Sequence, residues 1–186
     1  MKTLLIGGAR SGKSSLALRW ANERSSRVCA LVTGTETDPE MAARIEAHRR
    51  ERPAHWRIRE EPIHLGAVLR NESEDLVLVD CLTLWISNCL WPSASEQADH
   101  DTWQAERADF IDALSTISAD VIIVTNEVGT GIVPNNAAAR IFRDEQGWLN
   151  QAVATVCDEV FFVTAGLPLC LKPTPPIPVH TTKPPR

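Results

Sequence analysis

A glycine-rich stretch near the start of the chain has the composition of a phosphate-binding loop. Residues 7–14 read GGARSGKS and fit the pattern G-x-x-x-x-G-K-[ST], with Gly7, Gly12, Lys13 and Ser14 at its fixed positions. Glycines let backbone N–H groups approach a polyphosphate, Lys13 can reach the outer phosphates, and the Ser14 hydroxyl suits Mg²⁺. The loop is completed by Gly8, Ala9, Arg10 and Ser11. The stretch predicts nucleotide binding; the alternative is a glycine-rich turn that fits by chance.

A carboxylate follows another apolar stretch. Residues 76–79 read LVLV and are followed by Asp80. In an open α/β sheet this places Asp80 at the carboxyl edge, where such sheets bind ligands and where it can hold Mg²⁺ directly or through water. Asp80 can equally cap the helix expected from Leu82, and the two roles are compatible.

A histidine lies among arginines in a predicted helix over residues 39–52. At about 100° per residue, Met41, Ile45, His48 and Arg52 fall within roughly 60° of one another. The cationic field of the nearby arginines disfavours imidazolium and leaves a neutral ring nitrogen that can act as a nucleophile. This arrangement indicates phosphoryl or nucleotidyl transfer through a covalent intermediate. The alternative is a core histidine whose ring nitrogens are satisfied locally.

The elements that must position these residues alternate between strand-length apolar runs and amphipathic stretches. This alternation predicts an α/β fold with a doubly wound, parallel sheet. Strands are expected at residues 3–6, 28–32, 76–79, 121–125 and 160–163, with a candidate edge strand at 56–59. Helices are expected at residues 13–24, 39–52, 82–90, 102–117 and 136–156. Asp38 is the expected N-cap of the second helix, and residues 92–101 are expected to form a surface loop.

Composition sets further limits. The 186 residues are 44% hydrophobic and 23% charged, typical of one compact domain, which we place at residues 1–172. Residues 173–186 are proline-rich and are predicted to form a disordered tail. A net charge of −5 argues against nucleic-acid or membrane binding. Without a membrane-length apolar run or a secretory pattern, the sequence predicts a cytoplasmic protein. The five cysteines lack a CxxC pair and predict reduced thiols rather than disulfides or a zinc site.

Several blocks together resemble the bifunctional adenosylcobinamide kinase and adenosylcobinamide-phosphate guanylyltransferase family. They are the loop at residues 7–14, the stretch at 41–56, Glu60, and TNEVGTGIVP at 125–134. The resemblance covers about residues 1–172. It implies a P-loop, RecA-like fold with a mostly parallel sheet flanked by helices, assembled as a homotrimer.

The resemblance also implies two reactions in cobalamin assembly. The family phosphorylates adenosylcobinamide with ATP or GTP and Mg²⁺, then transfers GMP from GTP to the new phosphate, releasing pyrophosphate. Its guanylylated histidine matches His48. Its nucleotide contacts match residues 7–14 and also Thr33, Gly34, Thr35, Arg49, Arg50, Glu51, Arg52, Glu60 and Asp80. The last position is often Glu in the family, so Asp80 is a conservative departure with a shorter reach.

Two other functions remain open on the sequence alone. One is a P-loop small-molecule kinase in which His48 is structural, which would transfer phosphate without forming a GMP adduct. The other is a nucleotide-dependent switch or binding module, which would turn over slowly and act on a protein partner. The sequence has no DNA-reading motif and no basic stripe, which argues against a nucleic-acid motor.

Overall fold

The computed structural model describes residues 1–35, 39–92, 95 and 97–173. It contains one seven-stranded sheet in the order β3-β2-β4-β5-β1-β6-β7. The strand pairs are parallel except for β6 and β7, which are antiparallel. The predicted α/β class with a mostly parallel sheet is therefore confirmed. The strands are β1 (Lys2–Gly7), β2 (Val28–Val32), β3 (Arg57–Glu60), β4 (Leu76–Asp80), β5 (Asp120–Asn126), β6 (Glu159–Thr164) and β7 (Leu167–Lys172).

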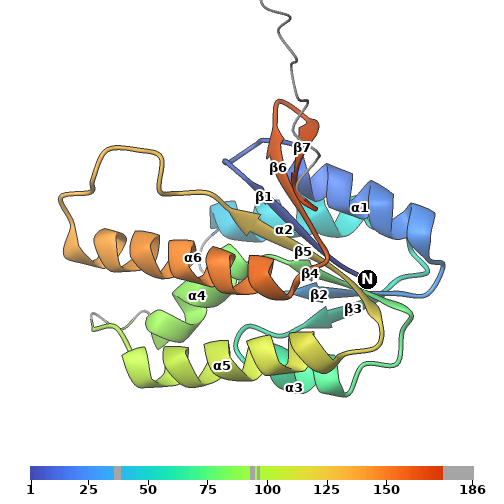
Figure 1. Ribbon diagram of the computed structural model, residues 1–186, viewed down its shortest axis with the longest axis horizontal. Helices are drawn as coiled ribbons and strands as arrows, with labels where there is room; N and C mark the ends of the chain where they lie inside the picture. Colours follow the sequence, from blue (N-terminus) through green and yellow to red (C-terminus); the bar gives the residue numbers. More distant parts are fainter. Residues whose placement is uncertain (36–38, 93–94, 96, 174–186) are drawn as a thin grey trace, which may run out of the picture.

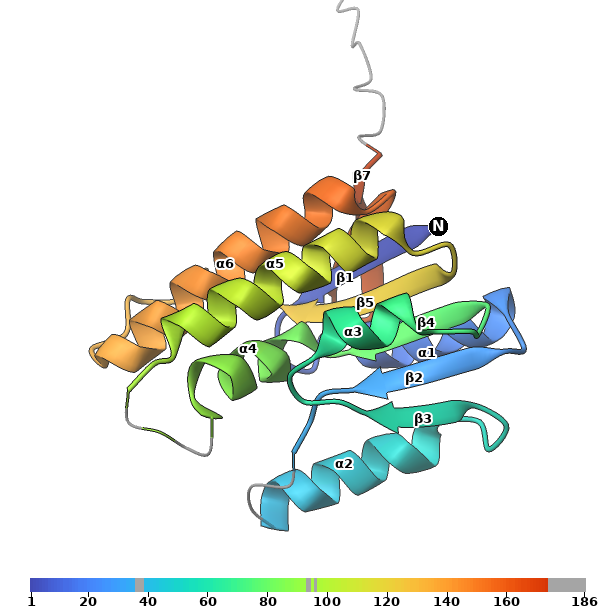
Figure 2. The same cartoon turned by 90° about the horizontal axis from the view of Figure 1, so that it is seen from below.

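Helices cover both faces of this sheet (Figures 1 and 2). One face carries α3 (Leu65–Arg70), α4 (Leu82–Leu90), α5 (His100–Thr116) and α6 (Ala137–Val156). The other carries α1 (Lys13–Arg24), with α2 (Pro39–Glu51) on the same side near β3. Each face has its own hydrophobic core, because the central strands are buried on both sides. Trp85, Trp103 and Phe110 are fully buried in the larger core.

The parallel register brings several strand ends to one edge of the sheet. Gly7 pairs with Asn126, and Asp80 pairs with Val32 and Val124. These residues end or adjoin the ends of four neighbouring strands, so the chain segments that follow them share one side of the molecule. The predicted phosphate loop begins at this edge.

The five main predicted strands are present, with their ends moved by no more than a residue. The candidate edge strand is also present, as β3, one residue later than expected. Helix α5 begins at His100 rather than Thr102, because the Asp99 carboxylate accepts a hydrogen bond from the N–H of Thr102 at 3.0 Å. The loop predicted at residues 92–101 therefore ends two residues earlier than expected, at Asp99. The predicted cap Asp38, parts of that loop (93–94 and 96) and the tail from residue 174 lie outside the described residues.

Two elements were not predicted. Helix α3 has only six residues, too few to show a helical repeat of apolar positions. Strand β7 contains Pro168 and directs three leucines to the surface, at 69%, 60% and 46% exposure for Leu167, Leu169 and Leu171. An edge strand with apolar residues outward does not have the composition of a buried strand, and proline is tolerated only at such edges.

The cysteines are all free, and three of them are packed in the interior. Burial raises the pKa of the thiol to about 11 at Cys29 and to about 12 at Cys89 and Cys157. These thiols are therefore protonated and unreactive at neutral pH. Among the described residues, no helix has the length and apolar character needed to cross a membrane.

The contact between α3 and α5 gives a test of this packing. A Cβ added at Gly66 would lie 2.8 Å from the backbone carbonyl of Asp109, so Gly66→Ala must push the two helices apart. We expect it to lower the free energy of unfolding by about 1–3 kcal/mol. Gly147→Ala, in open space within α6, should instead raise it by up to about 1 kcal/mol. Urea denaturation measures both, and equal effects would contradict the close contact at Gly66.

Candidate active site

The predicted phosphate loop connects β1 to α1 in a compact turn. Gly7 ends the strand, Lys13 begins the helix, and Gly12 between them has φ 92°, a left-handed conformation that favours glycine. A Cβ at Gly7 would collide with the carbonyl oxygen of Val163. The N–H of Ser11 donates to the carbonyl of Gly8 at 3.3 Å. Both glycines of the motif are thus required by close backbone approach.

Lys13 is held inside this loop. Its side chain is buried, with 8% of the residue exposed, and Nζ donates to the carbonyl oxygen of Gly8 at 3.1 Å. Burial lowers the pKa of the Lys13 ammonium, and the charge of nearby Asp80 opposes that shift. No ion pair of Lys13 with a described residue is present. A polyphosphate in the loop would supply the negative charge that the buried ammonium favours.

Asp80 forms an ion pair with Arg52. The Nη2 atom of Arg52 donates to Oδ2 of Asp80 at 3.1 Å, and the side chains are only 5% and 15% exposed. Arg52 follows the last residue of α2, so this contact ties the end of α2 to the end of β4. The Nε atom of Arg52 is buried and has no hydrogen-bond partner among the described residues. Arg52 thus has a donor to offer to a further acceptor.

The other predicted residues of this segment lie further out. Arg49 contacts Glu60 at 2.7 Å, which ties α2 to the end of β3. Arg50 pairs with Glu46 at 3.0 Å and is 78% exposed. Glu51 is exposed at the end of α2. Of the four residues predicted at 49–52, Arg52 is the one that the structure buries beside Asp80.

Thr33 has a role that the sequence did not indicate. Its hydroxyl donates to the carbonyl of Cys81 at 2.7 Å and accepts from the N–H of Cys81 at 3.0 Å. Thr33 is fully buried and fixes the chain just after Asp80. Gly34 packs against α2, since a Cβ added there would be 3.4 Å from Ile45 Cδ1. Thr35 is exposed. The Thr33 side chain therefore supports the site by holding the backbone directly after Asp80.

The backbone of His48 belongs to α2, three residues after Ile45 and four before Arg52. Ile45 lies on the side of α2 that faces Gly34, and Arg52, just beyond the end of the helix, contacts Asp80. Residues spaced by three and four share a helix face. The side chain of His48 is not among those described, so its predicted role as the nucleophile stays a prediction.

Two backbone contacts to the loop come from segments outside its own sequence. The N–H of Glu127 donates to the carbonyl of Gly7 at 3.1 Å, and the N–H of Gly166 donates to the carbonyl of Ser11 at 2.8 Å. Backbone hydrogen bonds do not depend on the type of side chain, so the sequence does not reveal them. The 125–134 block was part of the family resemblance, but nothing in the sequence indicated Gly166.

The side-chain oxygen atoms near the loop are suitable ligands for Mg²⁺. This hard cation prefers oxygen ligands and binds few protein groups when a nucleotide supplies phosphate oxygens. Asp80 uses Oδ2 for Arg52, while Oδ1 accepts no hydrogen bond from the described residues. The Ser14 hydroxyl, in the first turn of α1, also has no hydrogen-bond partner among the described residues. Asp80 and Ser14 are thus chemically suited to the role predicted for them.

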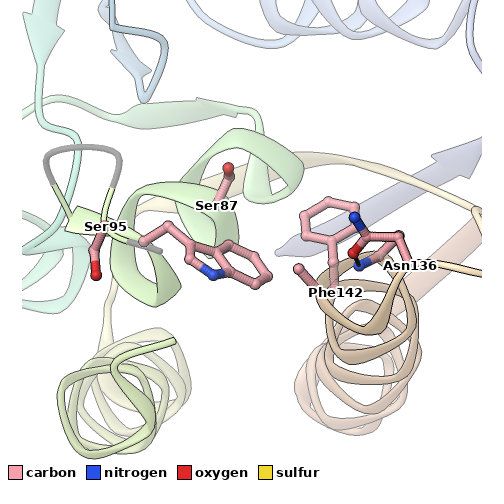
Figure 3. A pocket seen from close by; sticks show the side chains of 7 residues that line it. Ser87, Ser95, Asn136 and Phe142 are labelled. Atoms are coloured by element: carbon pink, nitrogen blue, oxygen red, sulfur yellow. Dashed lines mark hydrogen bonds between the residues drawn. The ribbon is translucent and has the colours of Figure 1, made fainter. Parts of the chain in front are cut away.

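An open pocket of about 540 Å³ lies elsewhere, between α4 and the start of α6 (Figure 3). Trp91 and Phe142 contact each other there with ring centroids 6.5 Å apart. The rest of its lining is formed by Ser87, Ser95, Asn136, Ala138 and Ala139. None of the residues predicted to bind nucleotide lines this pocket.

The fold and the loop together define a P-loop nucleotide-binding protein of the α/β class. A solved ATPase from the type III secretion system of pathogenic bacteria has a similar fold, with a TM-score of 0.52 at 9% identity over 91% of this chain and 56% of that one. Residues 3–171 match the family described as cobinamide kinase / cobinamide phosphate guanyltransferase. The chain belongs to this family of bifunctional cobalamin-biosynthesis enzymes, which confirms the predicted family and activities.

Relatives of known name support the same assignment. The bifunctional adenosylcobalamin biosynthesis protein CobP of Pseudomonas aeruginosa is 45% identical, over 94% of this chain and 99% of its own length. The bifunctional adenosylcobalamin biosynthesis protein CobU of Escherichia coli is 39% identical, over 92% of this chain and all of its own. Near-complete coverage means that the similarity extends well beyond the P-loop.

The Arg52–Asp80 pair can be tested by removing one charge. Arg52→Met should lower the free energy of unfolding by about 2–3 kcal/mol, because it leaves the largely buried Asp80 carboxylate without its partner. Arg50→Met, which breaks an exposed pair on the same helix, should change it by less than about 0.5 kcal/mol. Denaturant titration compares the two variants. Equal effects would mean that the inner pair does not hold α2 to the sheet.

Proposed function

We propose that one nucleotide site, built on residues 7–14, serves both reactions of this enzyme. In the first, ATP or GTP phosphorylates the aminopropanol hydroxyl of adenosylcobinamide. In the second, GMP passes from GTP to adenosylcobinamide phosphate, giving adenosylcobinamide-GDP and pyrophosphate. The observation that carries the proposal is the contact of Arg52 with Asp80 at 3.1 Å, because it brings the histidine-bearing helix to the edge where the phosphate loop begins.

The kinase step depends on positioning and charge. The loop N–H groups and Lys13 hold the β- and γ-phosphates, so that the acceptor oxygen can attack the γ-phosphorus. Mg²⁺, held by Ser14 and Asp80, would neutralise charge on the phosphate oxygens when bound. The low exposure of Lys13 strengthens its interaction with the phosphates, because little water screens it.

The guanylyl step assigns His48 as the nucleophile. A neutral ring nitrogen attacks the α-phosphorus of GTP, the bond to the β-phosphate oxygen breaks, and pyrophosphate leaves. An oxygen of adenosylcobinamide phosphate then attacks the histidine-bound GMP, the P–N bond breaks, and His48 is regenerated. Helical spacing supports this assignment, since position 48 lies one turn after Ile45 in α2 and four residues before Arg52, which follows the end of the helix.

The arginines of α2 must change partners during this cycle. Arg49 and Arg52 are paired with Glu60 and Asp80, and a guanidinium that contacts a departing pyrophosphate must leave or share its carboxylate. We therefore propose that α2 moves relative to the loop when nucleotide binds. The remaining proposed nucleotide contacts are Thr33, Gly34, Thr35, Arg50, Glu51 and Glu60.

Three broader proposals accompany this mechanism. Residues 1–172 act as one kinase and guanylyltransferase domain, since the family match spans residues 3–171. The enzyme works as a homotrimer, as its resemblance to the family implies. It acts in the cytoplasm, where its ATP and GTP substrates are found.

Intact-mass measurement tests the covalent intermediate. After incubation with GTP and Mg²⁺, the wild-type protein should gain the mass of one GMP in an acid-labile bond, because phosphoramidates hydrolyse in acid. His48→Ala should gain nothing yet keep measurable kinase activity. A wild-type protein that binds GTP without gaining GMP would favour the simple kinase, with a structural His48.

Lys13→Ala tests the single nucleotide site. Because the loop lysine neutralises polyphosphate whichever phosphorus is attacked, both activities should fall by at least about 100-fold. Arg19→Ala removes an exposed cation from the same helix, α1, as a matched control, and it should retain both activities far better. Normal GMP transfer by Lys13→Ala would mean that the two reactions use separate nucleotide sites.

A further inference from the structure

The turn between β6 and β7 contacts the middle of the phosphate loop from outside the loop's own sequence. The N–H of Gly166 donates to the carbonyl oxygen of Ser11 with an N to O distance of 2.8 Å. Thr164 pairs with Leu167, so Ala165 and Gly166 form the whole turn. Figure 1 shows this turn at the end of the hairpin, beside the segment between β1 and α1.

The backbone of the turn fixes the direction of this N–H group. Ala165 has φ 51° and Gly166 has φ 78°. Two central residues with positive φ are what the tightest β-hairpin turn requires, because that turn matches the twist of its strands. Strand β6 also pairs directly with β1, through Ile6 and Phe162. The turn is therefore placed by the same sheet that places the start of the loop.

Gly166 and Gly12 approach each other closely. A Cβ added at Gly12 would lie only 3.0 Å from the Cα of Gly166. Gly12 directly precedes Lys13, the first residue of α1. The turn thus limits where the Ser11–Gly12 peptide can lie, and through it the position of the first turn of α1.

The loop has little other support in its middle. The hydrogen bonds that Ser11 and Lys13 make within the loop both end on the carbonyl of Gly8. The Ser11 hydroxyl is buried without a hydrogen-bond partner among the described residues. The Glu127 contact supports only the start of the loop, at Gly7. Among the residues that the structure describes, Gly166 is therefore the one outside the loop that forms a hydrogen bond to the middle of the loop.

We propose that Gly166 is a positioning residue for nucleotide binding in both reactions. Its N–H holds the Ser11 carbonyl, so that the loop keeps its N–H groups and Lys13 arranged for a polyphosphate before the nucleotide arrives. This inference rests on the proposed nucleotide site at residues 7–14. Gly166 itself need not touch the nucleotide, because it acts through the Ser11–Gly12 peptide.

Two substitutions at this position compare loss and retention of the N–H group. Gly166→Pro removes the donor and, because the proline ring cannot adopt a φ of 78°, also disturbs the turn. Gly166→Asn keeps the donor, tolerates a positive φ, and adds a Cβ where no atom lies within 4 Å. We expect Gly166→Pro to raise the Kd for GDP with Mg²⁺ and the KM for ATP about tenfold, with kcat changed less than about threefold. Gly166→Asn should stay within about threefold of wild type in all three. Equal affinities of the two variants would overturn the proposal.

Hydrogen exchange of the wild-type protein tests the same contact without any substitution, in case Gly166→Pro does not fold. Binding of GDP and Mg²⁺ should slow exchange at the Gly166 amide about fivefold or more, together with residues 8–14, because a filled loop opens less often. Slower exchange in the loop with no change at Gly166 would overturn the proposal. GDP binding that leaves residues 8–14 unprotected would instead overturn the nucleotide site itself, and this inference with it.

Discussion

The parallel hydrogen-bonded register of β1, β4 and β5 is the constraint on which the site depends. It pairs Gly7 with Asn126 and Asp80 with Val124, so the segments that follow these strands emerge on one side of the sheet. A shift of one residue would turn every side chain of a strand to the opposite face. Because these strands are buried on both sides, such a shift would disrupt both cores. The packing of the sheet therefore fixes where Lys13 and Asp80, the residues proposed to bind nucleotide and Mg²⁺, lie relative to each other.

The buried charges at this edge do not balance one another. Lys13 and Arg52 bring two cations to the surroundings of one carboxylate, Asp80, and all three side chains are largely withdrawn from water. Such an arrangement is costly unless each charge has a partner. It carries an excess of positive charge that a polyphosphate with Mg²⁺ can satisfy. The free enzyme is thus electrostatically complementary to its nucleotide substrates before they bind.

The sequence predicted the parts of this structure that are carried by residue type. Glycines, lysine and serine at fixed spacing located the loop, and buried apolar runs located the central strands. It missed α3, which is too short to show periodicity, and β7, whose leucines face outward. It also missed what is carried by backbone groups, such as the Gly166 to Ser11 hydrogen bond. Thr33 was predicted from the family resemblance as a nucleotide contact, yet its hydroxyl is engaged by Cys81, a pairing that only three-dimensional proximity reveals.

The two halves of the site are held by different kinds of interaction. The phosphate loop is attached through backbone hydrogen bonds from Glu127 and Gly166, which belong to segments following or joining strands of the sheet. Helix α2 is attached at its end through ion pairs of Arg49 and Arg52, whose carboxylates can be exchanged for phosphate oxygens at little net cost. In the proposed mechanism the kinase step needs a rigid phosphate loop, whereas the histidine that first receives GMP and then releases it must serve two different partners. A fixed loop and an exchangeable helix contact would therefore suit the proposed single nucleotide site to two successive reactions.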